Sequence, residues 1–187
     1  MTINRNQFFS FIKRDLFNNK YTQQQVDGIS SILDTWENDY KTLSLPDVAY
    51  CLATVYHETA KTMTPIEEYG KGKGKKYGKV DSTTGKAYYG RGYVQLTWLR
   101  NYALAGIKLG IDLVKHPELA LDLEIASKIM FQGMRDGWFT GKKLSNYCHK
   151  NPPDFLNARR IINGLDRAGL IASYARRFLD GLVHSNS

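Results

Sequence analysis

Apolar residues recur every three or four positions along most of the chain, the period of an α-helix that buries one face. The pattern predicts helices over residues 6–17, 22–36, 46–60, 95–109, 122–135, 154–162 and 166–181. Three of the starts are marked: Thr22 and Gln25 form a capping-box pattern, Pro46 suits a first helical turn, and Asp122 suits an N-cap. The chain is therefore expected to be mainly α.

Residues 61–94 interrupt this pattern and are called the insert below. They are rich in Gly, Lys and Tyr, with turn signals at 81–85 that indicate a long loop with one small hairpin. A loop of this length inside a compact domain is usually functional. We expect residues 1–187 to form a single α-rich domain with a cleft beside the insert, since no linker or repeat divides the chain.

The chain has 187 residues, of which 42% are hydrophobic, enough for a sizeable core. No apolar run approaches the roughly 18 residues that span a bilayer. The first twenty residues lack the unbroken apolar centre of a signal peptide. Two cysteines are too few for a disulfide framework and are typical of a protein made in a reducing compartment.

Positive charge is concentrated in two segments. The chain carries a formal +8, of which residues 61–91 hold a net +5 and residues 155–187 a net +3, while the rest sums to zero. Such a field attracts polyanions, namely nucleic acid, anionic lipid or an anionic cell-wall polymer. The alternative is a solvated lysine loop kept for solubility.

Motifs for metals and nucleotide cofactors do not fit. His57-Glu58 begins a zinc-protease pattern, but Lys61 stands where its second histidine belongs. The run of glycines and lysines at 70–76 matches neither phosphate-binding glycine motif. We therefore expect no metal and no cofactor.

Three carboxylates suggest hydrolytic chemistry. Glu58 falls near the C-terminal end of an apolar helix, where desolvation and the helix dipole would both favour its neutral, acidic form. Glu67 and Glu68 follow inside the lysine-rich insert, where a carboxylate stays ionised and suits a general base. One protonated and one ionised carboxyl across a cleft is the machinery of glycoside hydrolysis. Spacing alone favours the alternative, a helix-end Glu and two surface Glu in ion pairs.

The sequence also resembles the family 19 glycoside hydrolases, which include chitinases and many phage endolysins. The resemblance lies in residues 56–59, 67–69, 88–98 and 101–102, and later in 160–164 and 166–167. The segment Tyr-Tyr-Gly-Arg-Gly at 88–92, followed by Gln-Leu-Thr at 95–97, is its most specific part. It covers about residues 45–180 and implies a lysozyme-like and chitinase-like, α-rich (α+β) fold.

The resemblance implies a role for each matching residue. Glu58 would be the general acid, Glu68 the general base with Glu67 as the alternative, and Thr97 the hydroxyl that holds the attacking water. Residues implied to contact the sugars are Gln95, Asn101, Asn163 and Arg167, and Tyr89 is added as one of a cluster of aromatic residues whose faces suit sugar rings.

The implied mechanism is inverting, with the two carboxyls about 6.5–9.5 Å apart. Two departures stand out: Ala60-Lys61 replaces the Gly-Gly of many members, and the segment from Asn163 to Arg167 is short. Among the aromatic residues of this stretch, we expect Trp98 to lie in the core.

The charge of the insert bears on the substrate, because chitin is neutral and peptidoglycan is anionic. We therefore expect a phage-type endolysin that cleaves the glycan backbone of peptidoglycan and works as a monomer without nucleic acid. It would be made in the host bacterial cytoplasm, reach the wall after release by a separate membrane-permeabilising protein, and contact the anionic wall or membrane surface through the insert.

Other interpretations stay open. The chain could be a chitinase acting on chitin oligomers, a non-catalytic wall-binding module, or a cationic membrane-active protein. The last of these depends on the final helix, which is basic and amphipathic and could lie on a membrane. Such a helix more often packs on the core.

Overall fold

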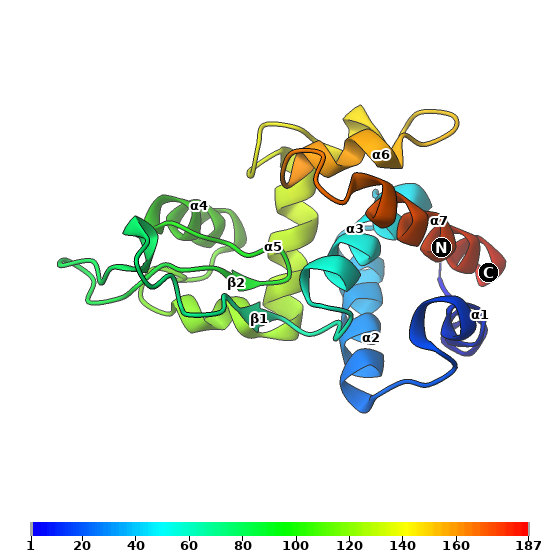
Figure 1. Ribbon diagram of the computed structural model, residues 1–187, viewed down its shortest axis with the longest axis horizontal. Helices are drawn as coiled ribbons and strands as arrows, with labels where there is room; N and C mark the ends of the chain where they lie inside the picture. The colour runs from blue at the N-terminus through cyan, green and yellow to red at the C-terminus, as the bar shows by residue number, and fades with distance from the viewer. Residues whose placement is uncertain (1, 187) are drawn as a thin grey trace.

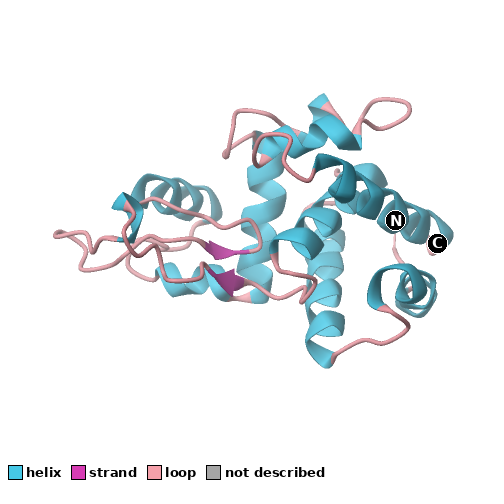
Figure 2. Ribbon diagram, in the orientation of Figure 1, coloured by secondary structure: helices cyan, strands magenta, loops and turns pink. Residues whose placement is uncertain are grey.

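Seven α-helices supply most of the regular structure in a computed structural model that describes residues 2–186 (Figures 1 and 2). Their bounds are α1 Arg5–Phe17, α2 Gln23–Asp39, α3 Leu45–Glu58, α4 Leu99–Leu109, α5 Leu123–Asp136, α6 Phe155–Ala158 and α7 Ala168–His184. Two short strands, β1 Ile66–Glu67 and β2 Arg91–Gly92, form one small sheet. The predicted mainly-α architecture is confirmed.

Helix α3 is the centre of the core. Every residue from Asp47 to Tyr56 is buried, because α7 packs along one side of the helix and α2 and α5 contact it elsewhere. Helix α7 buries Ile171, Phe178 and Leu182, and its Gly181 lies close to α1. The terminal helix is therefore a core helix. In the described part of the chain, no helix is long and apolar enough to cross a membrane.

Helix starts follow the sequence signals in most places. The Thr22 hydroxyl accepts from the backbone N–H of Gln25 at 3.2 Å, the Gln25 side chain accepts from the Thr22 N–H in return, and Asp122 caps α5. Two predicted helices are wrong in extent. The helix predicted from residue 95 begins at Leu99, because Gln95 and Trp98 have positive φ values that no α-helix contains. The one predicted over 154–162 is a short α6 followed by a 3₁₀ turn at Arg159–Ile161.

The insert contains one antiparallel pair of strands and, further out, the turn predicted at residues 81–85. Strands β1 and β2 pair antiparallel, with Ile66 opposite Gly92 and Glu67 opposite Arg91. Further out, Val80 and Ala87 form an isolated bridge around a turn that begins at Asp81. Figure 1 shows these loops beside α4, at the end of the molecule away from both termini.

One close approach fixes the segment that follows α3. Gly28 of α2 lies against the backbone of Met63, so closely that a Cβ at this position would be 1.9 Å from the Met63 carbonyl oxygen. The same oxygen accepts a hydrogen bond from the Tyr93 hydroxyl at 3.1 Å. Gly28 of α2 and Tyr93 therefore hold the Met63 backbone between them, and this fixes the segment that runs from Glu58 to β1.

Candidate active site

Glu58 is the last residue of α3, and its carboxylate is paired with an arginine. Nη1 of Arg159 lies 2.5 Å from Oε1 of Glu58, and Nε of Arg159 donates to the Asp166 carbonyl at 3.2 Å. The arginine side chain is 4% exposed and that of Glu58 is 21% exposed. A buried guanidinium thus contacts the predicted acid.

This contact corrects one expectation. The sequence predicted apolar, desolvated surroundings for Glu58, whereas the structure places the Arg159 guanidinium against its carboxylate and leaves 21% of its side chain exposed. Arg159 was not among the predicted site residues, because it is 101 positions from Glu58 along the chain and no local pattern joins the two. Only the fold brings them together.

Glu67 lies among cations and hydroxyls on strand β1. Its carboxylate accepts from the Tyr89 hydroxyl at 2.6 Å, and it lies 3.1 Å from Nζ of Lys71 and 3.6 Å from Nε of Arg91. The hydrogen bond from Tyr89, aided by the charge of Lys71 and Arg91, lowers the pKa of Glu67 although partial burial opposes the shift. This is the ionised carboxylate that the sequence predicted for the insert.

Glu68 has different neighbours, because successive residues of a strand point to opposite faces. Its Oε1 accepts from the Tyr77 hydroxyl at 2.7 Å, and its Oε2 accepts from the Gly90 N–H at 3.1 Å. The bond to Glu68 raises the pKa of Tyr77. Glu68 thereby ties the outer part of the insert to the segment just before β2.

Three predicted residues line one pocket between the insert and the helices. Gln95, Thr97 and Asn101 share a pocket of about 140 Å³ with Phe139 and Ile162. The Gln95 amide donates to carbonyls on both strands of the sheet, and the Asn101 amide donates to the Thr97 carbonyl at 2.8 Å. The Gln95 amide therefore anchors the pocket to the sheet that carries Glu67, and the Asn101 amide holds the backbone of Thr97.

The remaining predicted residues lie at the edge of this arrangement. Asn163 follows Ile162 and is exposed, with its side chain bonded to the neighbouring Gly164 N–H. Arg167 is exposed at the start of α7. Tyr89 is only 8% exposed, under the Arg91 guanidinium at 3.7 Å, so its position supports Glu67 more than it presents a surface to sugar.

Comparison with known families assigns the chain to a family. A family model described as chitinase class I matches residues 42–152, which is more than half of the chain. The chain belongs to glycoside hydrolase family 19. The matched range includes Glu58, Glu67, Glu68 and Thr97, whereas Arg159 lies beyond it.

Individual family 19 relatives match over shorter stretches. The chain is 34% identical over 98 residues to endochitinase At2g43590 of Arabidopsis thaliana, a match that covers 50% of the chain and 36% of that protein. It is 38% identical over 65 residues to inactive chitinase-like protein 1 of Hevea brasiliensis, a match that covers 35% of the chain and 20% of that protein. The chain thus spans about a third or less of the length of these curated relatives.

A solved structure matches almost the whole chain. Chitinase C from Streptomyces griseus HUT6037 is 26% identical, with a TM-score of 0.66 over 97% of this chain and 76% of its own. The chitinase-like fold predicted from the sequence is therefore confirmed.

One aromatic residue of the family 19 segment is not where the sequence placed it. Trp98 was expected in the core, but it is 41% exposed and contacts the Tyr77 ring edge to face at 5.4 Å. Its φ of 73° and ψ of 134° belong to a region that bulky residues rarely adopt, at a cost of order 1–3 kcal/mol.

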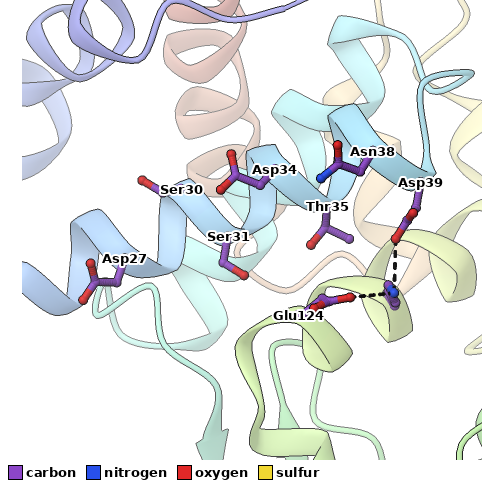
Figure 3. A pocket seen from close by; sticks show the side chains of 9 residues that line it. Asp27, Ser30, Ser31, Asp34, Thr35, Asn38, Asp39 and Glu124 are labelled. Atoms are coloured by element: carbon purple, nitrogen blue, oxygen red, sulfur yellow. Dashed lines mark ion pairs between the residues drawn. The ribbon is translucent and has the colours of Figure 1, made fainter.

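A second depression, between α2 and α5, contains none of the predicted site residues (Figure 3). It has a volume of about 460 Å³ and is lined mainly by carboxylates, hydroxyls and an amide, with Lys128 bridging Asp39 and Glu124 at 3.2 and 2.7 Å. Within residues 2–186, no group of His, Cys, Asp and Glu side chains is suited to hold a metal ion.

Proposed function

We propose that this family 19 chain is a glycosidase that hydrolyses the glycan backbone of bacterial peptidoglycan. The observation that carries the proposal is that two carboxylates of the family 19 segment lie on different elements in different surroundings: Glu58 at the end of α3 contacts Arg159, and Glu67 on β1 accepts from Tyr89 beside Lys71. Two carboxyls on different elements suit hydrolysis of a glycosidic bond, and the Gln95 amide ties the pocket that contains Thr97 to the two strands of the sheet, one of which carries Glu67.

Each side chain has a role in the proposed reaction. Glu58 gives a proton to the glycosidic oxygen, while the base takes a proton from water that attacks the anomeric carbon. Thr97 orients that water through its hydroxyl. We favour Glu67 as the base because it lies between the cations Lys71 and Arg91, whereas both oxygens of Glu68, the other candidate, accept hydrogen bonds within the insert.

The lysines of the insert favour an anionic polymer. Lys73, Lys75, Lys76, Lys79 and Lys86 form no ion pair within residues 2–186, so their charge is free to act on a ligand. Peptidoglycan carries carboxylates and associated anionic polymers, whereas chitin is neutral. A positive surface raises the rate of encounter with the anionic substrate.

The biological setting follows from this substrate. We infer a phage-type endolysin that is made in the host bacterial cytoplasm and acts on the wall after another protein permeabilises the membrane. It would act as a monomer, with the insert contacting the anionic wall or membrane surface, and would use neither nucleic acid nor a cofactor. The second candidate function is chitin hydrolysis, which the names of the relatives and of the similar structure favour.

Reducing-end assays on two purified substrates test the proposal. We expect the protein to release reducing ends from peptidoglycan faster than from chitin oligomers, and the Glu58→Gln variant to release none from either. Turnover of chitin with peptidoglycan untouched would establish the second candidate instead. An unchanged rate in Glu58→Gln would remove Glu58 from the mechanism.

Catalysis itself needs this control, because one family relative is named as inactive. A non-catalytic wall-binding module would sediment with peptidoglycan and release no reducing ends. Glu58→Gln keeps the shape of the side chain, so it is expected to sediment with the wall as the wild type does.

A further inference from the structure

A groove on the outer side of the insert combines aromatic rings with lysines. It has a volume of about 380 Å³, and its lining includes Lys76, Tyr77, Lys79, Asp81, Tyr88 and Trp98. None of these residues lines the pocket that holds Gln95 and Thr97. We call it the aromatic–lysine groove.

We propose that the aromatic–lysine groove is a binding site for an acidic part of the glycan strand, outside the pocket where the bond is cut. The proposal rests on the proposed function, because it assigns the groove to the same substrate. It names the chemical class that the groove selects: sugar units that carry a carboxylate or a phosphate.

The aromatic wall of the groove is held in place at an energetic cost. Trp98 has a strained backbone conformation. Its backbone N–H donates to the Tyr88 carbonyl at 2.8 Å, which fixes the residue although 41% of it remains exposed. Tyr77 meets the indole edge to face and is fixed in turn by its bond to Glu68. Rigid, exposed aromatic rings offer apolar area to a sugar ring, and their polar ends can bond its hydroxyls.

The charge of the groove is positive. Lys76 and Lys79 form no ion pair among residues 2–186. The one carboxylate in the lining, Asp81, is turned into its own loop, where it accepts from the N–H groups of Thr83 and Thr84 and from the Thr84 hydroxyl. Two free ammonium groups beside aromatic rings suit an anionic sugar better than a neutral one.

The groove also adjoins the reacting centre along the chain. Trp98 directly follows Thr97, and Tyr77 is bonded to Glu68, which is the residue next to Glu67 on the hairpin. Under this proposal, a glycan strand that enters the pocket at Thr97 continues over Trp98. This continuity makes an extension of the same glycan the occupant that the geometry favours.

Binding measurements with two probes test the assignment. The probes are glycan strands of peptidoglycan freed of their stem peptides, which keep the lactyl carboxylates, and a neutral chitin hexamer. Binding is measured in a Glu58→Gln background, so that no probe is cut. Trp98→Gly removes the indole and places at φ 73° the residue that tolerates it best, which protects the fold.

We expect Trp98→Gly to weaken binding of the acidic strands about tenfold, in line with the contribution of an aromatic contact. The double variant Lys76→Ala/Lys79→Ala is expected to weaken binding of the acidic strands about fivefold at low salt and to leave binding of the chitin hexamer unchanged. Ile107→Ala, at an 80% exposed apolar residue of α4, and Lys20→Ala/Lys41→Ala are matched controls that should change neither affinity.

Two results would overturn the assignment: unchanged affinity of Trp98→Gly for the acidic strands, or an equal loss for both probes in the double lysine variant. Failure of the groove assignment can be distinguished from failure of the proposed function. If the protein with Glu58 intact cuts neither polymer, the proposed function fails while the binding data still decide the groove. If it cuts peptidoglycan and Trp98→Gly binds normally, only the groove fails.

Discussion

Glu67 and Glu68 are neighbours in sequence, yet their side chains have different partners because successive residues of extended backbone point to opposite faces. Glu67 is held by Tyr89, Lys71 and Arg91, which keep it ionised, whereas Glu68 accepts from Tyr77 and from the Gly90 backbone. The contacts therefore favour Glu67 as the base and give Glu68 a structural part in the insert.

Replacing each carboxylate by its amide separates the two roles. We expect Glu67→Gln to lower kcat on peptidoglycan by about 10²–10⁴, the usual contribution of a general base, and Glu68→Gln to lower it by less than about tenfold. Steady-state kinetics on the same substrate measure both. The reverse order would make Glu68 the base, as the family resemblance by itself suggested.

Individual side chains were predictable where a motif holds them. Gln95, Thr97 and Asn101 fall within a few positions of one another, and the structure puts them in one pocket. Arg159 and the exposure of Trp98 were not predictable. The first depends on a contact across 101 residues and the second on a backbone conformation that local propensity disfavours.

At the scale of elements, the position of Glu58 depends on how α2 meets the segment after α3. Gly28 lets the helix backbone approach the Met63 carbonyl, and Tyr93 of the insert bonds the same oxygen. A side chain at Gly28 would push these elements apart, because backbone atoms cannot move aside as a flexible side chain can.

Two helical glycines give a matched pair of variants. Gly28→Ala is expected to reduce the free energy of unfolding by about 1–3 kcal/mol, the usual effect of overpacking. In Gly169→Ala of α7, the new Cβ has no neighbour within 4 Å, and the better helix propensity of Ala should raise that free energy by a few tenths of a kcal/mol, up to about 1. Urea denaturation of both proteins measures the difference. Equal effects would show that Gly28 is not needed for close approach.

Helices whose apolar stripe and start signal agree were predictable almost to the residue, as α2 and α5 show. The start of α4 was not, because the apolar residues at 94 and 96 continue the helical pattern while the chain there turns back to bond strand β2. At residues 94–97, which line the pocket that contains Thr97, tertiary contacts therefore override the periodic signal.

Charge is separated across the whole molecule. Unpaired lysines gather on the insert, whereas the depression between α2 and α5 is lined by Asp27, Asp34, Asp39 and Glu124, of which Asp34 pairs with Arg5 and the last two pair with Lys128 (Figure 3). The unpaired positive charge therefore favours approach of an anionic polymer to the insert. The sequence predicted the charge of the insert. The fold adds that the residues of the insert form both the strand that carries Glu67 and most of the aromatic–lysine groove.

The central claim is that Glu58 and a hairpin carboxylate cut the glycan backbone of peptidoglycan. Mass spectrometry of the sugar ends released from purified peptidoglycan, with Glu58→Gln beside the wild type, tests it most directly. We predict new reducing sugar ends at a single type of glycosidic bond in the wild-type digest and none in the variant digest. Fragments that carry no new sugar ends, or equal ends in both digests, would contradict the account.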